Sequence, residues 1–402
     1  MDCVGIVVPR FGDEVVGGSE ALARHLANLL AQSFEVHIIT TTIKDFGSDE
    51  RYYRSGESIL ENGVKVIRFE PDHKQWHYSG QQDPWTYYEI PNPLAGSKVM
   101  IPEVLAELRK TPVQVCERFI SDHGPYSTRM QEFLIENRKK YKKVIFTPYL
   151  HATTYYGVDC LAKKQVVIFM AAHDEPFIYL PALEKYSHFE QWVYTKNENT
   201  IIRKSCGISK VKQSLVIPPV IFERKYDETN YDKHLLTFSG RASYGKNFDQ
   251  LVALIAKSRE SNLPLRLQVL GEADAQALQL IRENRDWIEL KNNLSSEERL
   301  VEMSKSLCLV NPSTLDSFGL VNIECYVAGI PALVNLDCPA FEELSKVLYF
   351  AGYHPNDNSF HDMIVRLQHS HLRDDRVSET RLSLSENFTA EKHLKKYSDL
   401  LK

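Results

Sequence analysis

Short apolar runs alternate with amphipathic segments along most of the chain. Val4 to Val8 is apolar, and in the next amphipathic segment, about Glu20 to Gln32, leucines recur at helical spacing. Val36 to Ile39 and Val64 to Phe69 are predicted as the next strands. Alternation of this kind is typical of a parallel sheet covered by helices. The pattern therefore predicts an α/β fold for the amino-terminal part of the chain.

The same pattern continues to about residue 220. Further strands are predicted at Val113 to Ile120, Val144 to Thr147 and Val166 to Met170. A last apolar run stops at Pro218-Pro219, and a charged stretch typical of a linker follows it. Residues 1–220 are therefore predicted to form one Rossmann-like domain.

A second series of strands and helices begins at Leu235. Its strands are predicted at Leu235 to Ser239, Arg266 to Leu270, Trp287 to Leu290, Leu307 to Val310, Ala332 to Asn335 and Val347 to Phe350. Its helices are predicted at Asn247 to Ser258, after the capping-box pattern Ser295 to Glu298, at Leu320 to Ala328 and from about Pro339. Residues 221–385 are predicted to form a second Rossmann-like domain, and residues 386–402 to carry a final amphipathic helix.

Composition narrows the class of protein. The chain has 402 residues, of which 43% are hydrophobic and 25% charged, as in ordinary globular proteins of two or three domains. The net charge of −5 does not favour nucleic acid as a partner. No apolar run approaches the roughly 18 residues of a membrane span, and the first residues lack a signal-peptide pattern. Seven scattered cysteines without a C-x-x-C pair indicate reduced thiols, so a cytoplasmic protein is expected.

The stretch from Asn311 to Asn335 carries the strongest chemical signal. An apolar strand stops at Asn311-Pro312-Ser313, a loop of small residues follows, and a helix then runs to Gly329. Free N–H groups and the positive end of the helix dipole would face the end of the strand, which suits a phosphate or another anion. Asp316 and Glu324 bracket the turn with seven residues between them, so both carboxylates can face one crevice.

A second loop of this kind follows the first strand of the second domain. Gly240-Arg241 ends that strand, and Lys246 precedes the next helix. Two cations on a strand-to-helix loop can clamp a diphosphate. Basic residues are common on surface loops, but this placement favours phosphate binding.

Three loops of the first domain also follow predicted strands, where open α/β sheets bind ligands. Gly17-Gly18 precedes a helix and either cradles a phosphate or forms a plain turn. Tyr149 and His151 lie on the second loop, and His173-Asp174-Glu175 lies on the third. Because adjacent residues seldom converge on one metal ion, we expect the third loop to hydrogen-bond a substrate instead.

Two segments allow two interpretations each. Asp72 to Leu94 is rich in aromatic residues and proline, and either forms an acceptor-binding lid or is a long insertion whose rings hold it to the surface. Arg138 to Lys143 holds five basic residues in six. This cluster could dock on anionic lipid, although a solvated helix end is the favoured interpretation.

The second half resembles the nucleotide-sugar-binding domain of retaining glycosyltransferases of family 4, which have the GT-B fold. The resemblance rests on Gly240-Arg241, four residues and Lys246, on the strand end at Gly271, and on Pro312-Ser313 before Ser317-Phe318-Gly319-Leu320 and Glu324. Gly17-Gly18, His173 and Ile217-Pro218-Pro219 extend it more loosely to the first half. It implies two Rossmann-like domains that face a central cleft, with the carboxyl-terminal helix returning to the first domain.

The resemblance also implies roles for residues. Arg241 and Lys246 would clamp the diphosphate, Glu324 would accept hydrogen bonds from the ribose hydroxyls, and Asp316 replaces a glutamate that faces the donor sugar. The implied catalytic residues are Asp316, Arg241, Lys246 and His173. The implied donor-binding residues are Gly240, Arg241, Lys246, Gly271, Ser317, Phe318, Gly319, Leu320 and Glu324. The implied acceptor or phosphate loop contains Gly17, Gly18, Tyr149 and His151.

Two departures from the family pattern leave alternatives open. Asp316 is one methylene shorter than the family's glutamate. Many members place a histidine just past the strand that Val144 to Thr147 represents, whereas this chain has Pro148-Tyr149 there, with His151 later and His123 on another loop. The sequence does not assign the role among these residues.

The activity that the resemblance implies is transfer of a sugar, with retention, from a nucleotide-diphosphate sugar to a glycan, lipid-linked or small acceptor. No metal or other cofactor is expected, since the chain contains no Asp-x-Asp pair. The alternatives are a GT-B-fold nucleotide-sugar epimerase and a non-catalytic sugar-binding subunit of a glycan-assembly complex. Peripheral contact with the inner face of a membrane is compatible with a lipid-linked acceptor.

Overall fold

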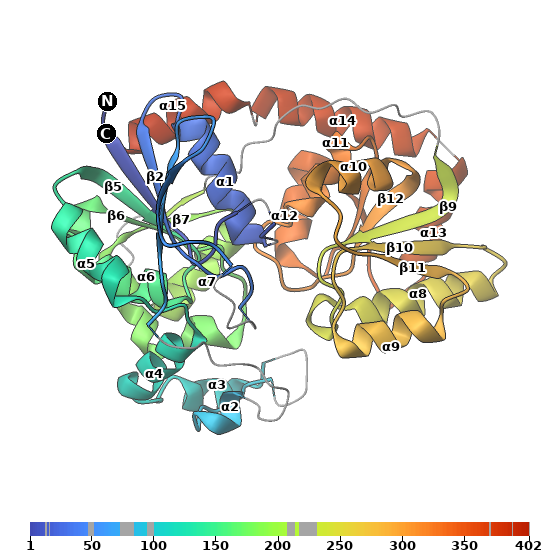
Figure 1. Cartoon of the computed structure of the whole chain (residues 1–402). Coiled ribbons are helices and arrows are strands. Elements are labelled where there is room, and N and C mark those ends of the chain that lie inside the picture. Colours follow the sequence, from blue (N-terminus) through green and yellow to red (C-terminus); the bar gives the residue numbers. More distant parts are fainter. Residues whose placement is uncertain are drawn as a thin grey trace. The chain divides into compact units, whose positions relative to one another are not determined.

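The computed structural model describes residues 1–12, 14, 15, 17–46, 52–72, 84–94, 100–206, 214–216, 231–369, 371–387 and 389–401. They form two compact units (Figure 1), one of Met1–Val220 with His393–Lys402 and one of Ile221–Lys392. Among the described residues, no helix has both the length and the apolar character that a bilayer crossing requires.

The first unit contains an eight-stranded sheet in the order β3-β4-β2-β1-β5-β6-β7-β8. Its strands are β1 (Cys3–Val7), β2 (Glu35–Thr41), β3 (Gly56–Ile59), β4 (Lys65–Phe69), β5 (Tyr141–Phe146), β6 (Val166–Phe169), β7 (Glu190–Val193) and β8 (Ser214–Val216). Neighbours pair parallel except β3 and β4, which are antiparallel. From β4 to β7 this is the doubly wound order, in which the chain changes direction between β1 and β5. Ligands of such sheets bind beyond the carboxyl ends of those two strands.

Helices of the first unit connect these strands. They are α1 (Gly18–Leu30), α2 (Pro84–Tyr87), α3 (Pro102–Leu108), α4 (Val113–His123), α5 (Thr128–Asn137), α6 (Ala152–Gly157) and α7 (Lys196–Cys206). The strands β1 and β6 are buried along their whole length. Parallel strands covered by helices on both faces need such continuous apolar runs, and for this reason the sequence signal for them is clear.

The second unit contains a six-stranded parallel sheet in the order β11-β10-β9-β12-β13-β14. Its strands are β9 (Asp232–Ser239), β10 (Arg266–Leu270), β11 (Ile288–Lys291), β12 (Ser306–Asn311), β13 (Ala332–Asn335) and β14 (Ala351–Tyr353). The order is again doubly wound, and the change of direction lies between β9 and β12.

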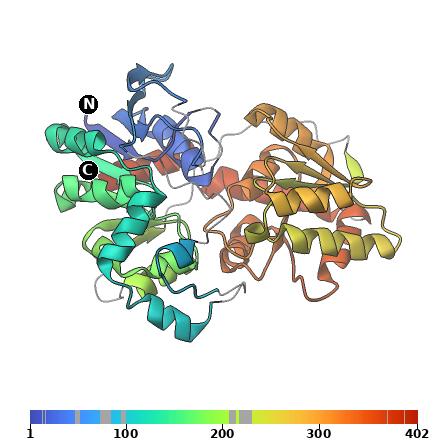
Figure 2. The same ribbon diagram turned by 60° about the horizontal axis from the view of Figure 1, so that its bottom comes forward.

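The helices of the second unit cover both faces of its sheet. They are α8 (Phe248–Glu260), α9 (Ala275–Glu283), α10 (Ser296–Ser304), α11 (Val321–Val327), α12 (Pro339–Leu348), α13 (Ser359–His369) and α14 (Leu372–Asn387). Figures 1 and 2 show α8 and α9 on one face, and α10 and α11 on the other. This arrangement follows from right-handed crossovers that first run from β9 towards β11 and then back towards β14.

Most predicted elements of the second unit are confirmed. The strands Arg266–Leu270 and Ala332–Asn335 have the predicted bounds. Ser295 and Glu298 form the predicted capping box, with the Ser295 hydroxyl accepting from the Glu298 N–H and the Glu298 carboxylate accepting from the Ser295 N–H.

Two strand predictions are wrong. Residues 113–120 lie in the helix α4, whose buried side chains Cys116, Phe119 and Ile120 follow helical spacing. Residues 347–350 contain the end of α12, which stops where Tyr349 adopts a left-handed conformation (φ 51°), and the strand β14 begins only after them. In both segments a short apolar run has been taken for a strand, although periodicity alone does not separate the two in runs of this length.

The described part of the aromatic segment Asp72 to Leu94 is held against the first unit. Trp85 stacks on Phe177 with ring centroids 4.6 Å apart, and the hydroxyl of the buried Tyr88 donates to Asp122 at 2.9 Å. These contacts favour the interpretation of a fastened insertion for this part. Trp76, His77 and Tyr78, on which the lid hypothesis also rests, lie outside the described residues.

The basic cluster Arg138 to Lys143 is partly neutralised within the first unit. Lys140 pairs with Glu35, Lys142 with Asp2 and Lys143 with Glu190, at N–O distances between 2.6 and 3.1 Å. The strand β5 begins at Tyr141, so this is a strand entry rather than only a helix end. Paired lysines are less available to lipid headgroups, and membrane contact through this cluster stays a prediction.

The last helix, α15 (Ala390–Leu401), is anchored to the first unit by its buried face. Tyr397 is fully buried, and its ring lies 5.4 Å from that of the fully buried Trp192 on β7. We expect Tyr397→Ala to lower the stability of the first unit by about 3 kcal/mol, because the large side chain leaves a cavity. Thermal and urea unfolding measure this effect. Lys395→Ala on the exposed face of the same helix is the matched control, and an equal loss there would contradict the anchoring role.

Candidate functional site

Two glycines shape the carboxyl edge of the second sheet beside the change of strand direction. Gly240 follows β9 with φ 128°, and Gly271 follows β10 with φ 141°. A Cβ atom on Gly271 would lie 2.4 Å from the carbonyl oxygen of Gly240, so the two strand ends approach too closely for a side chain. The space around the missing Cβ of Gly240 is open. The backbone therefore leaves room for a ligand on that side.

The two predicted cations follow this edge. The Arg241 side chain is exposed, and its Nε lies 3.7 Å from Glu272 in a loose ion pair. Lys246 ends a 3-10 turn (Tyr244–Lys246), and its Nζ lies 3.2 Å from Oδ2 of Asp316. The structure thus brings Lys246 to the loop that follows β12, whereas the Arg241 head group contacts a different partner.

Asn247 joins the two loops, a role that the sequence analysis missed. It adopts a left-handed conformation (φ 55°) and is buried. Its Nδ2 donates to the Pro312 carbonyl oxygen at 3.0 Å and to the Thr314 hydroxyl at 3.1 Å. The position of Lys246 relative to Asp316 is therefore fixed by its neighbour in the chain. The sequence does contain one signal for such a role, an asparagine directly before a predicted helix, because asparagine tolerates positive φ.

Asp316 organises the loop between β12 and α11. Its Oδ1 accepts from the Gly319 N–H at 2.8 Å and from the Phe318 N–H at 3.3 Å. Gly319 has φ 71°, and a Cβ there would collide with Asn322 and Phe341. In this state the Asp316 carboxylate accepts from the N–H groups of two residues that are predicted to bind the donor. Ser317 and Leu320, the other predicted donor residues of this loop, flank those two residues.

Glu324 lies on α11 and pairs with a residue that the sequence analysis did not single out. Arg299 on α10 places its Nη2 3.3 Å from Oε2 of Glu324, and each side chain is about a quarter exposed (25% and 28%). No short motif contains both residues, so only the packing of α10 beside α11 reveals the pair.

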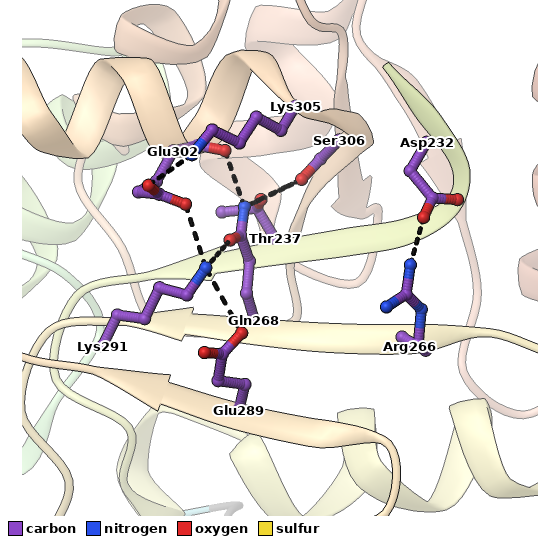
Figure 3. A network of polar contacts seen from close by, with 9 residues as sticks. All are labelled: Asp232, Thr237, Arg266, Gln268, Glu289, Lys291, Glu302, Lys305 and Ser306. Atoms are coloured by element: carbon purple, nitrogen blue, oxygen red, sulfur yellow. Dashed lines mark hydrogen bonds and ion pairs between the residues drawn. The ribbon is translucent and has the colours of Figure 1, made fainter.

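A polar network joins the strands β9, β10, β11 and β12 to the helix α10 (Figure 3). Gln268 on β10 donates through Nε2 to the Thr237 hydroxyl, the Ser306 hydroxyl and the Glu302 carbonyl oxygen at 2.7 to 2.9 Å. Lys291 at the end of β11 pairs with Glu302 at 2.9 Å and with Glu289 at 3.2 Å. The Lys291 side chain is thus directed to protein partners.

Gly17 and Gly18, at the start of the helix α1, differ in their surroundings. A Cβ on Gly17 would lie 2.1 Å from Oε2 of Glu20, a buried carboxylate that pairs with the buried Arg10 at 2.6 Å. Gly17 is therefore needed for protein packing. A Cβ on Gly18 would meet nothing within 4 Å, so only Gly18 leaves open space for a ligand.

Glu175 brings two predicted residues of the first unit together. His173 Nε2 lies 3.2 Å from its Oε2, and the buried Tyr149 donates its hydroxyl to its Oε1 at 2.6 Å. Burial by itself would raise the pKa of Glu175, but His173 and Tyr149 lower that pKa overall. Asp174 instead accepts from Tyr179 at 2.7 Å, so the three adjacent residues do not converge on one point.

Glu198 on α7 holds the strand ends behind His173. Its two carboxylate oxygens accept from the N–H groups of Ala172 at 2.8 Å and Tyr194 at 2.7 Å. Burial raises the pKa of Glu198 to about 8, against the effect of these N–H donors. A buried carboxyl with a shifted pKa often lies near a functional site, although here its contacts also serve the loop itself.

His151 and His123 lie in a stack of rings. The His151 ring is 4.7 Å from that of Phe46 and 5.5 Å from that of His123, and its Nδ1 lies 2.9 Å from the Gly124 carbonyl oxygen. Burial lowers the pKa of His151 to about 4 and that of His123 to about 3. Both rings are therefore neutral at neutral pH. Tyr149 and His151, predicted on one loop, point to different partners.

Among the described residues, one group of potential metal ligands lies near the amino ends of β1 and β2. Cys3, Glu35 and His37 place one possible ligand atom each within 4.8 Å of one another. The Lys140 ammonium lies 3.1 Å from Glu35 and supplies the positive charge there, and burial raises the pKa of Cys3 to about 11. These contacts suit a neutralised protein cluster better than a metal site.

Comparisons with known proteins concern the family of the second unit and the fold of the chain. Residues 221–388, which lie in the second unit, match the family described as Glycosyl transferases group 1. A search of curated proteins finds no match.

Solved structures match over the whole chain. Sucrose-phosphate synthase from Thermosynechococcus elongatus is 16% identical with a TM-score of 0.68, and the match covers 100% of this chain and 98% of that one. Trehalose-6-phosphate synthase OtsA is 13% identical with a TM-score of 0.65, over 99% and 98%. HepE from Anabaena, in complex with UDP and glucose, is 10% identical with a TM-score of 0.64, over 100% and 99%. The chain has the GT-B fold.

Proposed function

We propose that the chain is a metal-independent retaining glycosyltransferase of family 4 that takes its sugar from a nucleotide-diphosphate donor. The observation that carries the proposal is the contact of Lys246 with Asp316, 3.2 Å apart beside the carboxyl ends of β9 and β12. The sheet changes direction between these strands, and doubly wound sheets bind nucleotides at such points. The group 1 domain covers both loops and supports nucleotide-sugar transfer.

Arg241 and Lys246 would stabilise the leaving group. As the bond between the sugar and the diphosphate breaks, negative charge grows on the phosphate oxygens. Cations beside these oxygens would stabilise this charge in the transition state more than in the ground state. Lys246 already lies at the loop after β12, and the exposed Arg241 side chain would turn from Glu272 to the phosphates. In the mechanism usually proposed for the family, the diphosphate leaves from the face that the acceptor attacks, and a phosphate oxygen takes the proton of the acceptor hydroxyl. The sugar then keeps its anomeric configuration.

Asp316 and Glu324 would bind the two ends of the donor. Glu324 would accept hydrogen bonds from the ribose hydroxyls, and Asp316 would face the sugar next to Lys246. His173 is proposed as a catalytic residue of the first unit. Its Nε2 lies 3.2 Å from Oε2 of Glu175, which orients the ring. The acceptor is proposed as a glycan, a lipid-linked sugar or a small molecule, and Gly18 offers the open backbone of the first unit.

The test begins with donor binding by the whole chain. UDP, GDP and ADP are compared by thermal shift in the presence of a chelator, because a ligand that binds the folded state raises its melting temperature. UDP is the first choice, since the similar HepE was solved with it. At least one of these nucleotides should raise the melting temperature by a few degrees.

Incubation with nucleotide sugars alone then separates the candidate functions. A transferase releases nucleoside diphosphate slowly by hydrolysis of its donor. Interconversion of two nucleotide sugars would identify an epimerase, and tight binding without turnover would identify a non-catalytic subunit. A complete loss of binding or turnover in the chelator would contradict metal independence.

A further inference from the structure

The helix α10 contacts both the end of β11 and Glu324 of the proposed nucleotide site. It begins directly after the loop that follows β11 and is fixed there by the Ser295–Glu298 capping box. Glu302 on this helix holds Lys291 at the end of β11 (Figure 3). Arg299, one turn before Glu302 and so on the same side of the helix, holds Glu324 on α11. One rigid element therefore sets both the end of β11 and the Glu324 carboxylate.

The Arg299–Glu324 contact leaves much of the carboxylate open. One guanidinium nitrogen, Nη2, contacts one oxygen, Oε2, at 3.3 Å rather than both oxygens in a bidentate pair. Among the described residues, no other ion pair is formed by Glu324, and its side chain is 28% exposed. Oε1 therefore remains available to hydroxyl donors from a ligand, and Oε2 keeps a lone pair for a second donor.

Arg299 lowers the stability of the fold by more than its ion pair with Glu324 is expected to add. Its Nε is buried and has no hydrogen-bond partner among the described residues. A buried donor without a partner destabilises the fold, and partly exposed ion pairs contribute little stability. An apolar side chain would therefore pack α10 against α11 at least as well. This imbalance is expected where a residue is kept for a ligand rather than for the fold.

We infer that Arg299 is a positioning residue that presets the Glu324 carboxylate for a vicinal diol, and that it thereby makes the site select ribonucleotides over 2′,3′-dideoxynucleotides. This inference rests on the proposed function. The guanidinium holds one carboxylate oxygen and leaves the other to accept from hydroxyl donors. It also removes rotamers of Glu324 in the unliganded protein, so less freedom is lost on binding.

The test compares matched nucleotides on matched variants. UDP and GDP, each with its 2′,3′-dideoxy form, are titrated by calorimetry into the full chain and into Arg299→Met, which keeps an aliphatic stem but no charge. Affinity for the ribonucleotide should fall about 10-fold, whereas affinity for the dideoxy form should change less than about twofold. Arg299→Lys restores a cation and should recover part of the loss. Arg282→Met, an exposed arginine of α9, is the control and should bind as the wild type does.

The outcomes separate this inference from the proposed function. An equal loss for both forms of the nucleotide, or no loss for either, overturns the role of Arg299 while nucleotide binding by the wild type stands. If the wild type binds neither UDP nor GDP, the proposed function falls and the inference falls with it. Steady-state kinetics give a second measurement, since a positioning role in ground-state binding should raise KM with kcat nearly unchanged. Melting temperatures of all variants exclude a general loss of fold.

Discussion

Replacing Lys246 with alanine should lower kcat/KM for the donor sugar about 100- to 1,000-fold. The Lys246 ammonium lies beside the change of strand direction, where the proposed mechanism develops negative charge on the departing diphosphate. The side chain is 45% exposed and its ion pair with Asp316 lies at the surface of the second unit, so the fold should survive the change. Initial rates at several donor concentrations, with thermal unfolding of the same samples, measure both effects.

Two companion variants sharpen this result. Lys246→Arg keeps the charge with a different head group and should retain part of the activity. Lys257→Ala removes an exposed lysine further along α8, where Nζ contacts Asn358 at 3.0 Å, and should leave the rate unchanged. Near-normal turnover by a well-folded Lys246→Ala protein would refute the diphosphate clamp. Equal losses in the Lys246 and Lys257 variants would point to damage of α8 instead.

The architecture was largely predictable because its strands are buried on both faces. Continuous apolar runs such as β1 and β6 are predicted as strands with little ambiguity, and their alternation with helices leads to a doubly wound sheet. The run at residues 113–120 was predicted as a strand because its apolar positions fit a strand and one face of a helix equally well. Its burial pattern, which distinguishes the two, exists only in the folded unit.

The residues of the candidate donor site could be predicted where they lie close together in the sequence. Gly240, Arg241 and Lys246 lie on one loop, and Asp316 and Glu324 lie on another, so their spacing can be read directly. Contacts between loops were not predictable. Asn247 binds the Pro312 carbonyl 65 residues away, and nothing in the sequence around either residue signals this bond.

The Arg299–Glu324 pair shows the same limit, since it depends on how α10 packs beside α11. In the first unit, neighbouring parallel strands β5 and β6 explain why Tyr149 and His173 lie close, because both follow the same edge of the sheet. That both side chains contact Glu175 could not be predicted, because strand order does not give the directions of side chains.

Asp316→Asn should lower kcat about 100-fold, whereas Asp316→Glu should keep at least about a tenth of the wild-type value. Asparagine retains an oxygen that can accept from the Phe318 and Gly319 N–H groups, so the loop should keep its shape. It lacks the negative charge that faces Lys246. Glutamate keeps that charge and has the length of the family's residue, although its longer side chain gives up the tight turn onto the two N–H groups. Donor kinetics and melting temperatures of the three proteins test this difference.

Asp357→Asn is the matched control, because Asp357 also accepts from a backbone N–H two residues ahead, at 2.7 Å, but lies outside the proposed site. This variant should turn over donor as the wild type does. If Asp316→Asn and Asp316→Glu lose activity equally while both remain folded, the charge at position 316 is not what the reaction uses. The aspartate would then serve the loop through its bonds to Phe318 and Gly319, and the match to the family's first carboxylate would fail. If only the asparagine variant is impaired, Asp316 performs the role of the family's glutamate despite its shorter side chain. Its hydrogen bonds to the Phe318 and Gly319 N–H groups are then a second role, which the shorter side chain permits.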